Sequence, residues 1–219
     1  AEIVKTVRMI APTFGGIHLE DIAAPRCFEI TDELKKALPI PVMHDDQDGT
    51  AAVMLGALLS ACGSLTINLS DVVIGQIGLG AAGQAIADLL MFYSGKPVLG
   101  TDIEPSGIEQ HIARGGIGCS LEEIMEKADV VVATTGVKGL IRPEQVRKGQ
   151  IIMALSNPDP EIDPSVALDR GASIAADGRT VNNVLGYPGI WKGTLNSGAS
   201  MITREMLISA GTALGRMSR

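Results

Sequence analysis

The stretch DVVIGQIGLGAAG, residues 71–83, decides the fold of this 219-residue chain. It opens with a short, nearly continuous apolar run, which is typical of a strand buried on both faces of a parallel sheet. Glycines follow at the spacing GxGxxG, and residues 81–93 continue with helical periodicity. A strand, a glycine turn and a helix in this order predict one unit of an open α/β sheet.

The same glycine turn predicts a dinucleotide site. Gly78 permits the tight turn, Gly80 lets the backbone approach a pyrophosphate, and Gly83 allows the helix to pack closely on the strand. The helix that follows points its amino end at the phosphates. A glycine-rich turn without a ligand is the alternative. The cofactor-binding candidates in this turn are Gly78, Gly80, Ala81, Ala82 and Gly83.

Asp102 ends the next predicted strand, at residues 97–102. Its carboxylate would accept hydrogen bonds from the adenosine ribose and repel a 2′-phosphate, which favours NAD over NADP. A solvated carboxylate at a strand end is the alternative interpretation.

Further apolar runs complete the predicted sheet. We expect strands at 129–134 and 150–155, a weaker strand at 172–175 and a helix at 120–127. Strands that alternate with helices imply right-handed βαβ units. The predicted fold class is therefore α/β, a doubly wound parallel sheet of the Rossmann type.

Two acidic pairs precede this sheet. Glu20 and Asp21 lie in an irregular stretch after two glycines, and Asp45 and Asp46 end a short strand. Four carboxylates in one cleft would repel one another, and a divalent cation would relieve the repulsion. All-oxygen ligands suit Mg²⁺ or Mn²⁺. From spacing alone, two unrelated surface pairs or helix caps are an equally good interpretation.

The flanks differ from the middle of the chain. We expect helices at 31–38, 49–62 and 200–217, a strand at 40–43 and a loop at 182–198. Residues 1–44 would then be the C-terminal part of a substrate and metal domain, and residues 45–181 the nucleotide domain. Residues 182–219 would be a loop and helix that return to the substrate domain, leaving a cleft between the two domains.

Composition narrows the class of partner. The net charge is −7 with dispersed Lys and Arg residues, which argues against nucleic acid or an anionic membrane and favours a small molecule. The three cysteines show no CxxC spacing, which is typical of a reducing, cytoplasmic protein. The apolar stretch 51–62 is too short to span a bilayer. The chain begins with Ala1 instead of Met, which indicates a processed product or a fragment.

Four motifs resemble those of bacterial-type malic enzymes. They are GGIHLEDIAAPRCF (15–28), HDDQDGTA (44–51), SNP (156–158) and VNNVLGYPG (181–189). The match covers essentially the whole chain. The resemblance implies that Glu20, Asp21 and Asp46 hold Mg²⁺ or Mn²⁺, with Asp45 as a catalytic acid that also orients the base.

The activity that this resemblance implies is oxidative decarboxylation of (S)-malate to pyruvate and CO₂, dependent on NAD and a divalent metal. Asn157 and Asn183 would contact the substrate carboxylate and the nicotinamide end of the cofactor, and Thr50 would lie near the cofactor. Family members are usually homodimers, so we expect one here.

Two features depart from the family pattern. Family members carry a tyrosine acid and a lysine base in an amino-terminal domain that we expect to lie outside these residues. Tyr93, Tyr187, Lys5 and Lys192 do not match those positions. Asp48 stands where related sequences usually have another residue, and it adds negative charge near the predicted metal. Two alternatives therefore stay open, a related NAD enzyme such as a malolactic type and a catalytically incomplete NAD-binding module.

Overall fold

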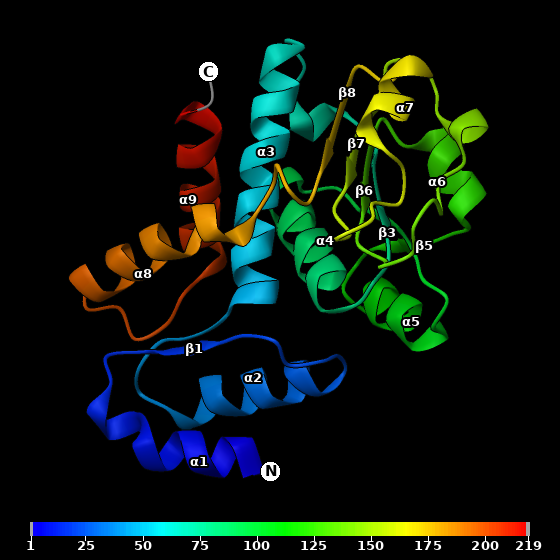
Figure 1. The fold of residues 1–219 in the computed structure, drawn as a ribbon. Coiled ribbons are helices and arrows are strands. Elements are labelled where there is room, and N and C mark those ends of the chain that lie inside the picture. The colour runs from blue at the N-terminus through cyan, green and yellow to red at the C-terminus, as the bar shows by residue number, and fades with distance from the viewer. Residues whose placement is uncertain (1, 218–219) are drawn as a thin grey trace.

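The computed structural model describes residues 2–217, and within them six parallel strands form one sheet (Figure 1). The strand order is β5-β4-β3-β6-β7-β8, so the chain winds outward in both directions from the neighbours β3 and β6. The strands are β3 (Ile74–Ile77), β4 (Leu99–Thr101), β5 (Ile117–Gly118), β6 (Val130–Ala133), β7 (Ile151–Ala154) and β8 (Ile174–Asp177). This order confirms the doubly wound, Rossmann-type fold.

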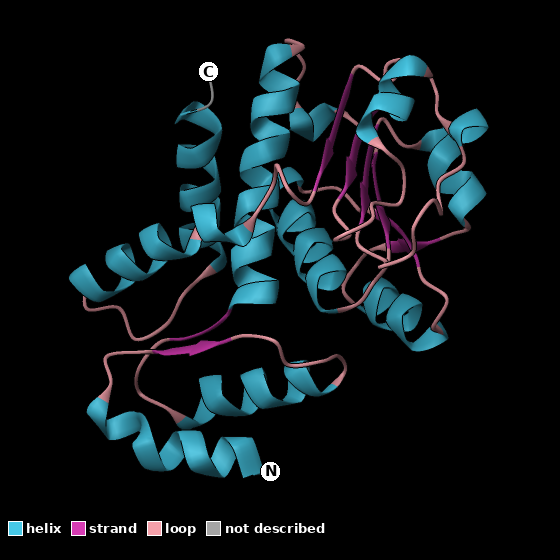
Figure 2. Ribbon diagram, viewed as in Figure 1, coloured by secondary structure: helices cyan, strands magenta, loops and turns pink. Residues whose placement is uncertain are grey.

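Helices cover both faces of this sheet (Figure 2). They are α3 (Thr50–Ser64), α4 (Ala81–Ser94), α5 (Pro105–Ala113), α6 (Leu121–Lys127) and α7 (Pro164–Asp169). Helix α9 (Arg204–Met217) packs mainly on the outer side of α3. Val130 and Val132 of β6 join the core beneath α3 and α4, whereas Val131 and Ala133 join the core beneath α6 and α7. Because successive residues enter two different cores, the strand is apolar throughout.

The amino-terminal residues form a smaller unit, drawn in blue at the bottom of Figure 1. It consists of α1 (Glu2–Ile10), β1 (Ile17–Leu19), α2 (Arg26–Ala37) and β2 (Val42–His44). The parallel pair β1–β2 and the two helices enclose a separate apolar cluster around Leu34. Helix α2 begins five residues before the predicted start at residue 31, and its first turns already bury Cys27 and Ile30.

The predicted loop at 182–198 is wrong. A short 3-10 turn, η5 (Asn183–Leu185), leads into helix α8 (Tyr187–Asn196). Pro188 suits the first turn of a helix, and Ile190 and Thr194 are buried one turn apart. Gly189 and Gly193 weaken the helical signal in the sequence. Helix α5 and strand β5 are also absent from the predicted elements, and the weak strand predicted at 172–175 lies two residues further on, as β8.

No helix within residues 2–217 combines the length and the apolar character that a membrane crossing needs. The longest buried helix, α3, instead packs against α4 on one side and α9 on the other. Glycines make the contact with α9 close. A Cβ atom on Gly211 would lie 2.7 Å from the carbonyl oxygen of Ala52, and one on Gly56 would lie 2.9 Å from that of Gly211. The two helix backbones therefore meet almost directly.

We predict that Gly211→Ala destabilises the fold by about 1–3 kcal/mol, because the added methyl group forces α9 away from α3. Gly193→Ala is the matched control, since it lies in α8 with nothing within 4 Å of its added Cβ. That variant should gain about 0.5–1 kcal/mol from higher helix propensity. Urea denaturation followed by circular dichroism measures both effects. Equal stability changes in the two variants would contradict the close packing.

Candidate functional site

A cleft of about 310 Å³ opens at the carboxyl edge of the sheet. It lies at the ends of the neighbouring strands β3 and β6, from which the chain continues to opposite halves of the sheet. Open α/β sheets bind ligands at this place. The cleft is lined by residues from the short turn η2 (Asp45–Gly49) and α3, from the start of α4, from the loops after β6, β7 and β8, and from η5. Predicted site residues among them are Asp46, Thr50, Ala82, Asn157 and Asn183.

The glycine turn after β3 forms one side of this site. Gly78 has a φ of +87°, a left-handed conformation that favours glycine. A Cβ on Gly83 would lie 1.9 Å from the carbonyl oxygen of Gly78, so the fold itself needs glycine there. Gly80 is different, because nothing lies within 4 Å of its added Cβ. The space over Gly80 is therefore open to a ligand.

Helix α4 begins at Ala81 and Ala82, both partly exposed. The first N–H groups of a helix have no partner within the helix, so they are available to an anion. Asp102 follows β4 beside the glycine turn, and its carboxylate accepts hydrogen bonds from the N–H of Leu79 at 2.5 Å and of Glu104 at 2.9 Å. These contacts fix the carboxylate next to the turn.

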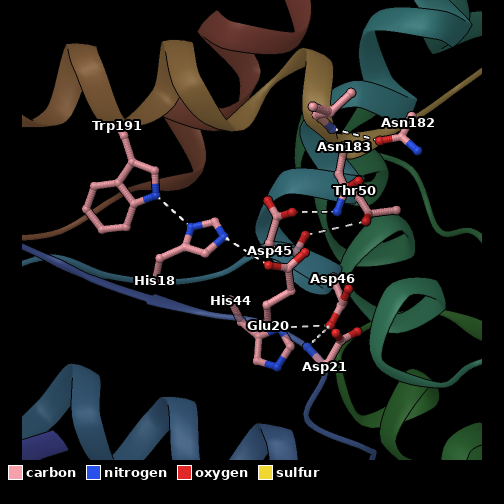
Figure 3. Close-up of polar contacts among 11 residues, drawn as sticks. His18, Glu20, Asp21, His44, Asp45, Asp46, Thr50, Asn182, Asn183 and Trp191 are labelled. Atoms are coloured by element: carbon pink, nitrogen blue, oxygen red, sulfur yellow. Dashed lines mark hydrogen bonds and ion pairs between the residues drawn. The ribbon is translucent and has the colours of Figure 1, made fainter.

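The two acidic pairs come together because β1 and β2 are parallel. Leu19 is opposite His44 in the register, so Glu20 and Asp45 leave neighbouring strands at the same edge. Asp21 has a φ of 57°, which aspartate tolerates better than most residues. Its N–H donates to Oδ2 of Asp46 at 3.0 Å (Figure 3). The interpretation as two unrelated surface pairs is therefore wrong.

Asp45 and Asp46 lie in η2 (Asp45–Gly49), a single turn of π-helix between β2 and α3. Such turns are frequent at functional sites. Asp45 is buried, and its carboxylate accepts a hydrogen bond from the side-chain amide of Asn183, while the Thr50 hydroxyl lies 3.4 Å from the Asp45 carbonyl oxygen. Burial raises the pKa of Asp45, and the charges of Glu20 and Asp46 raise it further. Oδ1 of Asp45 has no hydrogen-bond partner.

The donor chemistry of this acidic cluster fits a hard divalent cation. Carboxylate oxygens are the ligands that Mg²⁺ and Mn²⁺ prefer, and the buried, unpartnered Oδ1 of Asp45 marks a lack of positive charge. Within residues 2–217 no three acidic, His or Cys side chains are already arranged to hold a metal. The Glu20 side chain is 57% exposed and would have to turn inward to do so.

His18 links the acidic cluster to α8, and nothing in the sequence pattern singles it out. Its Nδ1 accepts a hydrogen bond from the indole N–H of Trp191 at 2.8 Å, and its Nε2 lies 4.0 Å from a carboxylate oxygen of Glu20 (Figure 3). The ring of Tyr187 lies 5.3 Å from that of His18. Trp191 is the only tryptophan of the chain. The fluorescence of this single indole is therefore a probe of the surroundings of Glu20.

The carboxylate of Asp48 forms an ion pair with Lys35. Lys35 of α2 donates to its carboxylate at 3.1 Å, and the N–H of His44 lies 3.4 Å from the same oxygen. His44 itself is completely buried, and this burial lowers its pKa. Since Lys35 offsets the charge of Asp48, this departure from the family pattern adds little negative charge to the cluster.

Sequence reasoning missed several residues that line the cleft. Thr134 and Gly136 follow β6, Gly178 follows β8, and Ser156 precedes Asn157 in the loop after β7. Their position at or just beyond the carboxyl ends of predicted strands is the signal that could have found them, because parallel strands place all such residues at one edge.

Comparison with known proteins extends these observations. The chain is 54% identical over its full length to NAD-dependent malic enzyme 1 of Bacillus subtilis and covers 50% of that protein. It is 39% identical to the bifunctional malic/malolactic enzyme of the same organism, over 99% of the chain and 58% of the relative. The chain thus spans about half the length of these relatives. No protein-family model matches the sequence.

Solved structures agree. The crystal structure of NAD-dependent malic enzyme from Thermotoga maritima matches with a TM-score of 0.88 and 37% identity, over 98% of this chain and 63% of that one. The malic enzyme of Pyrococcus horikoshii matches with a TM-score of 0.89 and 36% identity, over 99% of this chain and 57% of that one. The resemblance seen in the sequence motifs is confirmed over the length of the chain, which belongs to the malic enzyme family.

Proposed function

We propose that this chain is the cofactor- and metal-binding part of an enzyme that converts (S)-malate to pyruvate and CO₂ with NAD⁺ as hydride acceptor. The observation that carries the proposal is a single cleft that joins the acidic cluster to the dinucleotide turn through Asp46, Thr50 and Ala82. Relatives at 54% and 38% identity are named NAD-dependent malic enzymes. An amino-terminal domain of a longer protein would supply the tyrosine acid and the lysine base.

The glycine turn would hold NAD⁺. Gly80 leaves room for the pyrophosphate, and the amino end of α4 faces it with free N–H groups. Asp102 still has acceptor capacity for a ribose hydroxyl after its two backbone contacts, because a carboxylate accepts about four hydrogen bonds. Its charge disfavours the 2′-phosphate of NADP.

Glu20, Asp21 and Asp46 would hold Mg²⁺ or Mn²⁺. When bound, such a cation supplies Lewis acidity that lowers the pKa of an alcohol and stabilises an enolate. Asp45 lies beside this group without being exposed, and Asn183 fixes its orientation through a hydrogen bond. We infer that Asp45 in turn orients the lysine base of that amino-terminal domain. Asn157 and Asn183 line the same cleft, where they would contact the substrate carboxylate and the nicotinamide end of the cofactor.

A malolactic outcome is the second candidate, because one relative is named a bifunctional malic/malolactic enzyme. In that case lactate would be released in place of pyruvate. A third candidate is an NAD-binding module without catalysis.

The full-length protein should form NADH from (S)-malate and NAD⁺ when Mn²⁺ is added, with pyruvate as the organic product. Absorbance at 340 nm and chromatographic quantification of pyruvate and lactate measure this. Lactate without net NADH would favour the malolactic candidate. NAD⁺ binding without any turnover of malate would support the non-catalytic module and overturn the main proposal.

Mn²⁺ should quench the fluorescence of Trp191, because the indole N–H donates a hydrogen bond to His18, which lies beside the proposed ligand Glu20. Asp46→Asn should raise the Mn²⁺ concentration needed for half-maximal quenching at least tenfold, since one charged ligand is lost. Asp48→Asn is the matched control, because its carboxylate faces Lys35. Equal weakening in both variants would argue against a metal held by Asp46.

Gly80→Val should abolish NAD⁺ binding and leave Mn²⁺ quenching of Trp191 intact. The new side chain has free space in the unliganded fold, so it blocks the cofactor without a clash. The expected stability cost is about 1 kcal/mol, from a poor helix N-cap. Isothermal titration calorimetry with NAD⁺ provides the measurement. If NAD⁺ binds Gly80→Val as tightly as wild type, the pyrophosphate does not lie over Gly80.

A further inference from the structure

A buried carboxylate lies directly behind one wall of the cleft. Glu161, in the loop between β7 and α7, is completely buried. It accepts hydrogen bonds from the N–H of Thr135 at 2.6 Å and its hydroxyl at 2.9 Å, and from the hydroxyl of Ser156 at 2.5 Å and its N–H at 3.3 Å. Among residues 2–217, no Lys, Arg or His forms an ion pair with it. Neutral donors alone satisfy this carboxylate.

The donors belong to two loops that form the cleft wall. Thr135 lies between Thr134 and Gly136, and Ser156 precedes Asn157; the four residues Thr134, Gly136, Ser156 and Asn157 all line the cleft. The Ser156 hydroxyl also accepts a hydrogen bond from the N–H of Gly136 at 2.7 Å. Glu161 therefore joins the loop after β6 to the loop after β7, in addition to the direct bond between Gly136 and Ser156.

The backbone ladder does not do this by itself. The bond from the N–H of Leu155 to the carbonyl oxygen of Ala133 continues the β6–β7 pairing to the edge of the sheet. Beyond it, Thr135 and Ser156 are joined through the Glu161 side chain. Burying a carboxylate is unfavourable unless donors compensate it, so a loop contact that only had to exclude water would be better made by an apolar side chain.

We infer that Glu161 is a positioning residue, which holds the two loops in the conformation that receives the nicotinamide end of the cofactor. This role rests on the proposed function, because it assumes that NAD⁺ occupies the cleft. Glu161 acts through Ser156, Gly136 and Asn157 and touches no ligand itself.

Glu161→Gln tests the inference, because it keeps the shape of the side chain and replaces one acceptor oxygen with an NH₂ group. That group would face the donors of Thr135 or Ser156. We expect faster hydrogen exchange at the amides of Thr135, Gly136 and Ser156 in the full-length protein, measured by NMR or mass spectrometry. NAD⁺ binding measured by calorimetry should weaken about five- to tenfold.

Asp163→Asn is the matched control. It lies two residues further along the same loop, and its exposed carboxylate caps α7 by accepting a hydrogen bond from the N–H of Ser165. Asparagine caps a helix as well as aspartate does, so exchange and NAD⁺ affinity should stay at wild-type values. Ser156→Ala gives a second route to the same link if Glu161→Gln folds poorly. If the two side chains act together, the double variant should bind NAD⁺ no more weakly than the worse single variant.

The outcomes separate the inference from the proposed function. Unchanged exchange at Thr135 and Ser156 in Glu161→Gln would overturn the link between the loops. Faster exchange with unchanged NAD⁺ affinity would overturn the positioning role while the proposed function stands. A wild-type protein that binds no NAD⁺ would overturn the proposed function and the positioning role together, and the exchange data would still decide whether Glu161 joins the loops.

Discussion

Parallel pairing is the constraint on which the rest of this structure depends. In a parallel sheet all carboxyl ends lie at one edge, so the direction of the strands alone brings the loops after β3, β6, β7 and β8 together. The smaller pair β1–β2 obeys the same rule and brings Glu20 beside Asp45. The turn η2 and helix α3 then connect the two units, because η2 follows β2 directly and α3 packs in the main core (Figure 1).

Charge is the second constraint, and it acts against folding at the acidic cluster. Burial raises the pKa of Asp45, and the nearby charges of Glu20 and Asp46 raise it further, so its ionised form is less stable here than in water. The structure offsets part of this cost with neutral donors, namely the amide of Asn183 and the N–H of Asp21. What remains unsatisfied, Oδ1 of Asp45, is the kind of group that a bound cation or a substrate would complete.

The sheet and the glycine turn were predictable because their signals are local. The run at 71–77 and the spacing Gly78, Gly80 and Gly83 determine strand, turn and helix within thirteen residues. Helix α8 was not, because Gly189 and Gly193 hide its periodicity and its stability comes from the burial of Ile190 and Thr194 against distant elements. The neutralisation of Asp48 by Lys35 and the contact of Trp191 with His18 likewise join residues from separate elements. Residue spacing along the chain contains no information on such contacts.

Two buried carboxylates show what sequence alone cannot distinguish. Asp45 and Glu161 are both almost wholly excluded from solvent and both lie at the carboxyl edge of parallel strands. Glu161 receives hydrogen bonds from two residues on neighbouring loops, so its charge is compensated and its geometry fixed. Asp45 keeps one oxygen without a partner, near other negative charges. A compensated carboxylate stabilises the wall of a site, whereas an uncompensated one retains the capacity to attract a cation or a proton. The difference lies in the number of donors that reach each group, and only the folded chain determines that number.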